Sequence, residues 1–205
     1  MIPILRGARP WLRVAAALAL AALLGGCASV YVDGAVKEVP ASALSKPAKA
    51  VPVQVFFEFQ TKGVANAQAT SLLKAKVLEQ INQSGLFASL VEQPSAGSGQ
   101  LSITLNNVPI SDDAFSKGFV TGLTFGLAGS QVSDGYICSA KFTPGDGAPA
   151  VTKSARHALH TTIGNAAAPG NATKAANVQG AVFTMTRQVL SQVLSDLSKD
   201  PSFNR

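Results

Sequence analysis

The chain has few of the residues and motifs that most often carry enzyme chemistry. Its 205 residues include two histidines, two cysteines and eleven acidic residues. It contains no G-x-S-x-G motif and no glycine-rich phosphate-binding loop. Ser71 and Lys74 match the S-x-x-K pattern of penicillin-binding enzymes, but the S-D-N and K-T-G elements that those enzymes require are missing. The sequence therefore predicts a protein that is not an enzyme.

The scarcity of histidine argues against a metal centre. His157 and His160 are the only histidines, and the β-branched residues around them favour a strand. On a helix the two rings could share a metal, whereas strand residues an odd number apart point to opposite faces. No Cys, Asp or Glu nearby offers a third ligand, although zinc sites generally use three or four. We therefore predict no metal and no cofactor.

Clusters of basic residues are also missing. The chain has 17 basic residues and a net charge of +6, but no run of Lys and Arg. Nucleic-acid-binding proteins typically combine a basic patch with stacking aromatic residues. Only 6% of this chain is aromatic. The composition therefore predicts that nucleic acid is not a partner.

No apolar run is long enough to span a bilayer. Residues 14–24 form an uninterrupted apolar stretch of eleven residues, well short of the ~20 that a spanning helix needs. Arg6, Arg9 and Arg13 precede it, and small residues follow it. This order is typical of a secretory signal peptide.

A cysteine directly follows the small residues that end this signal peptide. The stretch Leu24-Gly25-Gly26-Cys27 resembles the bacterial lipobox. The resemblance implies that Cys27 receives a diacylglyceryl group, that residues 1–26 are removed, and that a further acyl chain is added. The alternative is an ordinary signal peptide with a chance cysteine. Removal of residues 1–26 takes away three arginines and no acidic residue, so the net charge falls from +6 to +3.

The residue after the cysteine bears on localisation. Ala28 is not aspartate. Under the sorting rule of enterobacterial lipoproteins, a residue other than aspartate here implies export to the outer membrane. We therefore expect a lipoprotein of a Gram-negative bacterium, held in the outer membrane by the acyl chains on Cys27 and facing the periplasm.

The mature chain divides into two parts in this interpretation. Residues 27–50 are rich in Ala, Ser, Lys and Pro without a sustained period, which is typical of a flexible tether. Residues 51–201 have the usual length of a single domain. With Cys27 acylated, Cys138 has no partner for an intramolecular disulfide. We expect Cys138 to be a small buried apolar residue, with a free reactive thiol as the alternative.

The domain alternates strand-like and helix-like patterns. Apolar residues with a period of two predict strands, and apolar residues at helical spacing predict two helices, the first with Gly85 as its C-cap. The predicted order is β-α-β-β-β-β-α. It indicates an α+β two-layer sandwich, a mixed sheet of about five strands with two helices on one face. The strands are residues 51–59, 87–91, 101–107, 131–142 and 151–163, the last two joined by a turn at 144–147, and the helices are 65–84 and 175–199.

The first forty residues of this domain resemble a known module. A strand, an amphipathic helix and the helix exit NQSGLFASL (residues 82–90) are similar to the amino-terminal domain of TolB. Small outer-membrane lipoproteins of the LpoB and YajG kind share this arrangement. The resemblance covers residues 51–91. It implies a non-enzymatic α/β module that docks on envelope proteins.

A glycine-rich apolar segment, residues 117–129, is a candidate contact surface. Its glycines recur every four residues, so on a helix they would form a groove without side chains. Three interpretations stay open: a connection packed on the domain's own sheet, an exposed patch that docks a partner or a second copy, and a loop that dips into lipid near the anchor. The candidate contact residues are Gly118, Phe119, Gly122, Leu123, Phe125 and Gly126.

Together these observations predict a lipid-anchored binding or adaptor module in cell-envelope assembly or maintenance, with an envelope protein as its partner. The first alternative is a carrier or transport accessory lipoprotein for a lipid or other apolar ligand. In that case the segment 118–129 would form its lid or mouth. A second alternative is a structural lipoprotein that forms homo-oligomers.

Overall fold

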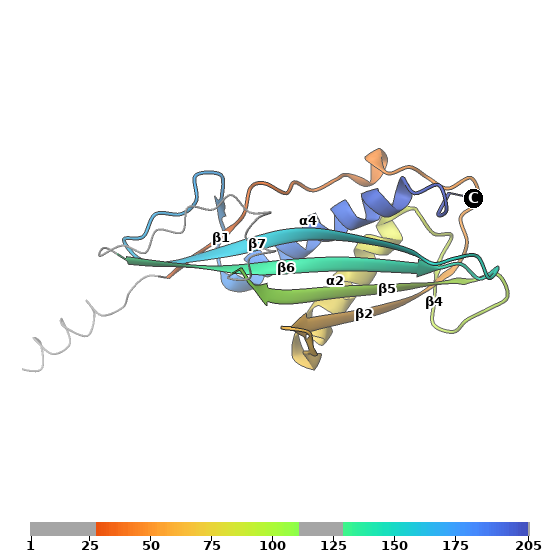
Figure 1. Ribbon diagram of the computed structural model, residues 1–205, viewed down its shortest axis with the longest axis horizontal. Coiled ribbons are helices and arrows are strands. Elements are labelled where there is room, and N and C mark those ends of the chain that lie inside the picture. The colour runs from red at the N-terminus through yellow and green to blue at the C-terminus, as the bar shows by residue number, and fades with distance from the viewer. Residues whose placement is uncertain (1–27, 111–128, 205) are drawn as a thin grey trace, which may run out of the picture.

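The computed structural model describes residues 28–110 and 129–204 of the chain. These residues form one large sheet with two long helices packed against it (Figure 1). The strands are β1 (Ser29–Val32), β2 (Val53–Thr61), β3 (Val64–Ala65), β4 (Leu90–Val91), β5 (Gly99–Pro109), β6 (Gly129–Thr143), β7 (Val151–Gly164) and β8 (Thr173–Lys174). The helices are η1 (Ala41–Ala43, a 3-10 turn), α2 (Ala67–Ser84) and α4 (Val178–Ser198).

The sheet is mixed and has eight strands in the described residues, in the order β3-β2-β5-β6-β7-β1-β8, with β4 paired to β2. Strand β2 runs parallel to β4 and β5, and the other pairs are antiparallel. The α+β class is confirmed. The predicted count of five strands and their order are wrong, because β3 and β8 have two residues each, too few for an apolar period, and β1 lies in the stretch expected to be a tether.

Much of the stretch expected to be a flexible tether, residues 27–50, instead packs against the sheet and helix α4. Strand β1 pairs with β7 on one side and β8 on the other. Further along, Leu44 is buried, the backbone N–H of Val39 donates to Ser191 Oγ (2.9 Å), and that of Ser45 donates to Ser198 Oγ (3.2 Å). Both serines belong to α4. Residues 29–45 are thus held along the sheet and the helix.

Both long helices begin at an asparagine cap. The side chain of Asn66 accepts from the N–H of Ala69 (3.0 Å), and that of Asn177 accepts from the N–H of Gly180 (2.8 Å). Each bond satisfies a backbone donor that the first helical turn leaves free. Helix α2 ends at Gly85, whose φ of 64° is the left-handed conformation that glycine adopts at little cost. The predicted C-cap is therefore confirmed.

The hydrophobic core lies between the helices and one face of the sheet. Alternate residues of β2, β5 and β6 point toward the helices, and directly paired residues such as Phe57 and Ile103 share this face. Both helices contribute their apolar stripes to the same cluster. The helical part of this core is Leu73, Val77, Ile81, Ala181, Met185, Val189, Leu190, Val193, Leu194 and Leu197.

One end of the sheet extends past the rest. Strand β5 ends at Pro109, which pairs with Asp134, while β6 continues to Gly129, which pairs with Gly164 of β7 (Figure 1). We call this end the sheet tip: residues 129–132 of β6, residues 161–164 of β7, and Ser29 and Val30 of β1. In the described ranges, no helix is long and apolar enough to cross a membrane.

Candidate functional site

The predicted lipidation residues and the candidate contact residues lie outside the described part of the chain. This applies to the lipobox residues Leu24, Gly25 and Gly26 and to Cys27. It also applies to the candidate contact residues Gly118, Phe119, Gly122, Leu123, Phe125 and Gly126. Their roles stay predictions. The candidate sites below come from the described residues.

The first candidate is a groove between the two long helices, with a volume of about 280 Å³. We call it the helix groove. It lies on the outer side of the helical layer, where α2 and α4 turn polar side chains toward each other. Its lining is mainly polar and carries charges of both signs. The lining residues are Glu38, Leu73, Lys76, Glu79, Gln80, Gln83, Phe183, Thr184, Thr186 and Arg187.

Contacts across the helix groove hold its two walls in register. Arg187 Nε lies 3.0 Å from Glu38 Oε2, which joins α4 to the segment after β1. Gln80 Nε2 donates to the backbone oxygen of Arg187 at 2.8 Å, joining α2 to α4. The Lys76 ammonium lies 4.9 Å from the centre of the Phe183 ring, a cation–π contact. The Arg187–Glu38 pair is about half exposed and therefore contributes little to stability.

One polar group in the helix groove is left without a partner. Thr186 lines the groove, and its buried hydroxyl has no hydrogen-bond partner among the residues that the structure describes. A buried hydroxyl without a partner costs about 1–3 kcal/mol. The contacts across the helix groove therefore give it a preformed shape, while the Thr186 hydroxyl is buried beneath its surface.

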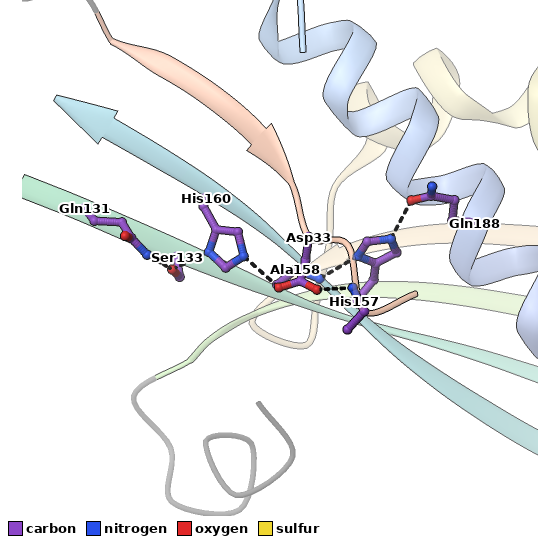
Figure 2. Close-up of polar contacts among 8 residues, drawn as sticks. Asp33, Gln131, Ser133, His157, Ala158, His160 and Gln188 are labelled. Atoms are coloured by element: carbon purple, nitrogen blue, oxygen red, sulfur yellow. Dashed lines mark hydrogen bonds and ion pairs between the residues drawn. The ribbon is translucent and has the colours of Figure 1, made fainter. Parts of the chain in front are cut away.

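A second candidate is a cluster of polar side chains on the opposite face of the sheet, shown in Figure 2. We call Asp33, Ser133 and His160 the buried polar cluster. His160 Nε2 lies 2.9 Å from Asp33 Oδ2, and His160 Nδ1 lies 2.7 Å from Ser133 Oγ. The His160 side chain is 0% exposed. One imidazole ring, that of His160 on β7, thereby joins β6 to the end of β1.

Hydrogen bonding determines the charge state of this cluster. The hydrogen bond from His160 lowers the pKa of Asp33 below its ordinary value. Burial acts in the opposite direction and raises this pKa. The N–H of Ala35, which donates to Asp33 Oδ1 at 2.7 Å, lowers the pKa further. Asp33 is therefore ionised at neutral pH. An ionised Asp33 only accepts hydrogen bonds, so His160 Nε2 carries the proton between them. In the neutral ring, Nδ1 then accepts from the Ser133 hydroxyl.

The connectivity of this cluster is that of a Ser-His-Asp catalytic triad, but its surroundings differ. A catalytic serine and histidine must reach the substrate. Here the imidazole is fully buried, and neither Ser133 nor His160 lines the cavities of about 280, 140 and 80 Å³ beside the helices. In addition, Ser133 bonds Nδ1, whereas Nε2 takes the serine proton in the serine proteases. The arrangement favours a structural link between strands.

The other histidine faces the helices. His157 Nε2 lies 2.7 Å from Gln188 Oε1 of α4, and His157 Nδ1 accepts from the N–H of Ala158 at 2.8 Å. This geometry fixes a neutral ring with its proton on Nε2. Burial lowers the pKa of His157, although the bond to Gln188 opposes this. The histidines therefore lie on opposite faces of β7, as the strand assignment predicts, and no group of three metal-ligating side chains occurs among residues 28–110 and 129–204.

Cys138 is one of the core residues of β6. It is 1% exposed, and burial raises the pKa of its thiol to about 12. At neutral pH it is therefore protonated and shielded from solvent, which disfavours a reactive thiol. Its environment is that of a small apolar core residue.

Sequence reasoning missed Asp33, because its partner His160 is 127 residues away along the chain. A local signal was present nonetheless. In the stretch SVYVDG, residues 29–34, apolar valines alternate with other residues and Asp-Gly follows, which is typical of a short strand ending in a turn.

No known protein family matches the chain, and no curated protein matches it in sequence. Several solved structures are similar to it. A neuraminyllactose-binding hemagglutinin homologue from Helicobacter pylori is 8% identical with a TM-score of 0.42, over 77% of this chain and 89% of that chain. A PelC dodecamer from Paraburkholderia phytofirmans is 10% identical with a TM-score of 0.34, over 83% and 97%. A minor lipoprotein from Acinetobacter baumannii is 13% identical with a TM-score of 0.35, over 75% and 92%.

Proposed function

We propose that this protein is a lipid-anchored lipoprotein on the periplasmic side of the outer membrane. In this proposal it is a non-enzymatic binding module in cell-envelope assembly or maintenance. The observation that carries the binding role is the helix groove, a preformed polar cavity of about 280 Å³ between α2 and α4.

The anchoring part of the proposal depends on the amino-terminal sequence. The apolar run at residues 14–24 and the stretch Leu24-Gly25-Gly26-Cys27 have the order of a lipoprotein signal. Lipobox processing would leave three acyl chains on Cys27. A single acyl chain holds a protein at a membrane only reversibly, and each further buried methylene adds about 0.8 kcal/mol, so three chains give a stable anchor.

The chemistry of the helix groove indicates the kind of partner. Glu38 and Glu79 supply negative charge, and Lys76 and Arg187 supply positive charge. Gln83 adds a neutral hydrogen-bonding group. These groups complement a polar protein segment that carries both charges. We therefore propose an envelope protein as the partner.

The carrier alternative has less support. A carrier of lipid or another apolar ligand needs a cavity lined mainly by apolar side chains. The helix groove is lined mainly by polar and charged residues, and the two smaller cavities beside the helices in the described ranges hold only about 140 and 80 Å³. The binding role is therefore the function that the geometry supports best.

Photo-cross-linking in living cells tests the binding role. A photoreactive amino acid replaces Gln83, which lines the helix groove, while Cys27 stays intact. The matched control carries it at Asn82, the exposed neighbour on α2 that is not part of the lining. We expect a discrete protein adduct from position 83, little from position 82, and a reduced yield from position 83 when Arg187→Ala is added. Equal yields at the two positions would contradict the helix groove as the partner site.

Mass spectrometry of the amino-terminal peptide tests the anchor. We expect the peptide to begin at Cys27 and to carry acyl chains, and the Cys27→Ser variant to lose them and to leave the membrane fraction. An unmodified peptide from the wild-type protein would contradict the anchoring part of the proposal.

A further inference from the structure

The start of the described chain lies at one end of the sheet. Ser29 pairs with Thr162, and Val30 pairs with Thr161. Two peptide links separate Ser29 from Cys27, a length of about 7.6 Å at most. If Cys27 carries the acyl chains, as proposed above, the bilayer is therefore tied directly to the sheet tip.

Apolar side chains are exposed at this same end. Val132 is 51% exposed and Ile163 is 44% exposed. In the β6–β7 ladder Val132 pairs with Thr161. Because Ile163 lies two residues after Thr161 on β7, Val132 and Ile163 are diagonal neighbours on one face of the sheet. Such neighbours lie about 7–8 Å apart or less. Together they form a small apolar patch.

The helices leave this patch uncovered. Along the helix-facing side of β7, His157 and Leu159 are buried, Thr161 is intermediate and Ile163 is exposed. On β6, Tyr136 is buried and Val132 is exposed. On β6 and β7 the exposure of this face therefore rises from the core toward the sheet tip, where the helical layer ends (Figure 1), while Val30 of β1 stays buried.

The sheet tip is also free of charged residues. Residues 28–32, 129–133 and 161–168 are uncharged. The nearest charges in sequence are Asp33, which is bonded to His160, and Asp134, and the exposed Lys174 of β8 pairs with Tyr31 next to Val30. Moving an uncharged surface into the interfacial region of a bilayer avoids the large cost of desolvating a charge.

The short link to Cys27, the exposed apolar patch and the missing charges all favour contact between the sheet tip and a lipid bilayer. We infer that the sheet tip, with Val132 and Ile163, rests in the interfacial region of the bilayer that holds Cys27. This inference rests on the proposed anchoring. The lipid-facing surface is then the end of the sheet, and the long strands β6 and β7 carry the domain away from the bilayer.

Tryptophan fluorescence tests the inference in the full acylated protein. The one tryptophan, Trp11, lies in the signal peptide, so processing leaves a chain without tryptophan. Ile163→Trp places a reporter at the sheet tip. Thr152→Trp is the matched control, since it is exposed on the same strand and lies eleven residues away, about 36 Å along the strand. Val132→Trp gives a second reporter at the sheet tip if Ile163→Trp does not fold.

The acylated variants are reconstituted in vesicles of phosphatidylethanolamine and phosphatidylglycerol, with and without phosphatidylcholine brominated near the glycerol end of its acyl chains. We expect bromolipid to quench Ile163→Trp about twofold or more, with blue-shifted emission, because interfacial side chains reach about 5–10 Å into the bilayer. Thr152→Trp should not be quenched. Equal emission of both reporters with Cys27 acylated overturns this inference alone. An unacylated Cys27 overturns the proposed anchoring and this inference with it.

Discussion

The helix-covered part of the sheet and the sheet end around β1 are held together by different forces. In the helix-covered part, leucine, valine and phenylalanine side chains from both helices and from strands β2, β5, β6 and β7 form one apolar cluster. Around β1, where Val30 and Val32 also join this cluster, further links come from strand pairing and the buried polar cluster of Asp33, Ser133 and His160. Apolar packing tolerates small shifts, whereas a buried hydrogen-bond network depends on every member. We therefore expect the two regions to respond differently to mutation and to pH.

The largest effect is expected in the helix-covered region. Leu194→Ala removes a fully buried side chain of α4 and leaves a cavity, which should lower the free energy of unfolding by about 3–4 kcal/mol. Urea unfolding followed by circular dichroism measures this. Leu72→Ala on α2 is the control, because Leu72 is 48% exposed, and it should be close to neutral. Similar losses for the two variants would show that α4 packing does not dominate stability.

Disruption of the buried polar cluster comes next. Asp33→Ala leaves His160 buried without its carboxylate partner, so we expect a loss of about 2–3 kcal/mol in the free energy of unfolding. Hydrogen exchange should show the loss of protection concentrated in β1 and the adjoining part of β7. Asp196→Asn, an exposed position of α4, is the control. Uniform loss of protection across α2 and α4 would contradict a link that is local to β1.

Acid should weaken both regions in two steps. Burial lowers the pKa of His157 in the folded chain. As the pH drops below about 6.5, the unfolded chain binds a proton at this histidine more readily than the folded chain does, so the free energy of unfolding falls. One proton contributes at most about 1.4 kcal/mol per pH unit. The lowered pKa of Asp33 adds a second loss as the pH falls below about 3.9 toward the folded-state value.

Urea unfolding at pH 7.5, 5.5 and 3.5 separates these steps. His157→Gln should reduce the loss of stability that begins below about pH 6.5, including the loss between pH 7.5 and 5.5. Asp33→Asn should leave the loss between pH 7.5 and 5.5 unchanged and reduce the loss that begins below about pH 3.9. A wild-type protein as stable at pH 5.5 as at pH 7.5 would argue against a neutral buried His157.

The smallest effect concerns the end of α2. Gly85→Ala forces a side chain into a backbone with φ of 64°, which should cost about 1 kcal/mol. Gly170→Ala is the matched control, because its φ is not positive and a Cβ there meets no atom within 4 Å. It should be neutral or slightly stabilising. Thermal unfolding of the two variants measures the difference, and equal midpoints would show that the left-handed cap contributes nothing.

The helix-covered part of the sheet could be predicted from the sequence better than the sheet end around β1, because local patterns determine the first and links between distant residues determine the second. Local patterns identify the long strands, the two helices and the Gly85 cap, since each depends on apolar spacing or on a single residue within one segment. Strands β3 and β8 have two residues each, so a period cannot be recognised in them, and the alternating valines of the four-residue β1 stand in a stretch whose composition is typical of a tether. The Asp33–His160 bond joins residues 127 positions apart and leaves no local pattern.

The helix groove was missed for a related reason. Its polar lining, including Lys76, Gln83 and Arg187, has the ordinary composition of solvent-facing helix surfaces. Only the packing of α2 beside α4 turns two such surfaces into one cavity. The spacing of polar residues within each helix contains no information on how far apart α2 and α4 lie.

The position of β1 has a mechanical consequence. This strand is hydrogen-bonded on both sides and runs along the sheet from the residue two positions after Cys27. A force that pulls the lipid anchor away from the domain acts along the strand axis. It therefore loads the β1–β7 hydrogen bonds in shear, all at once, rather than opening them one after another. A domain fastened in this way can bear tension between a membrane and a bound partner.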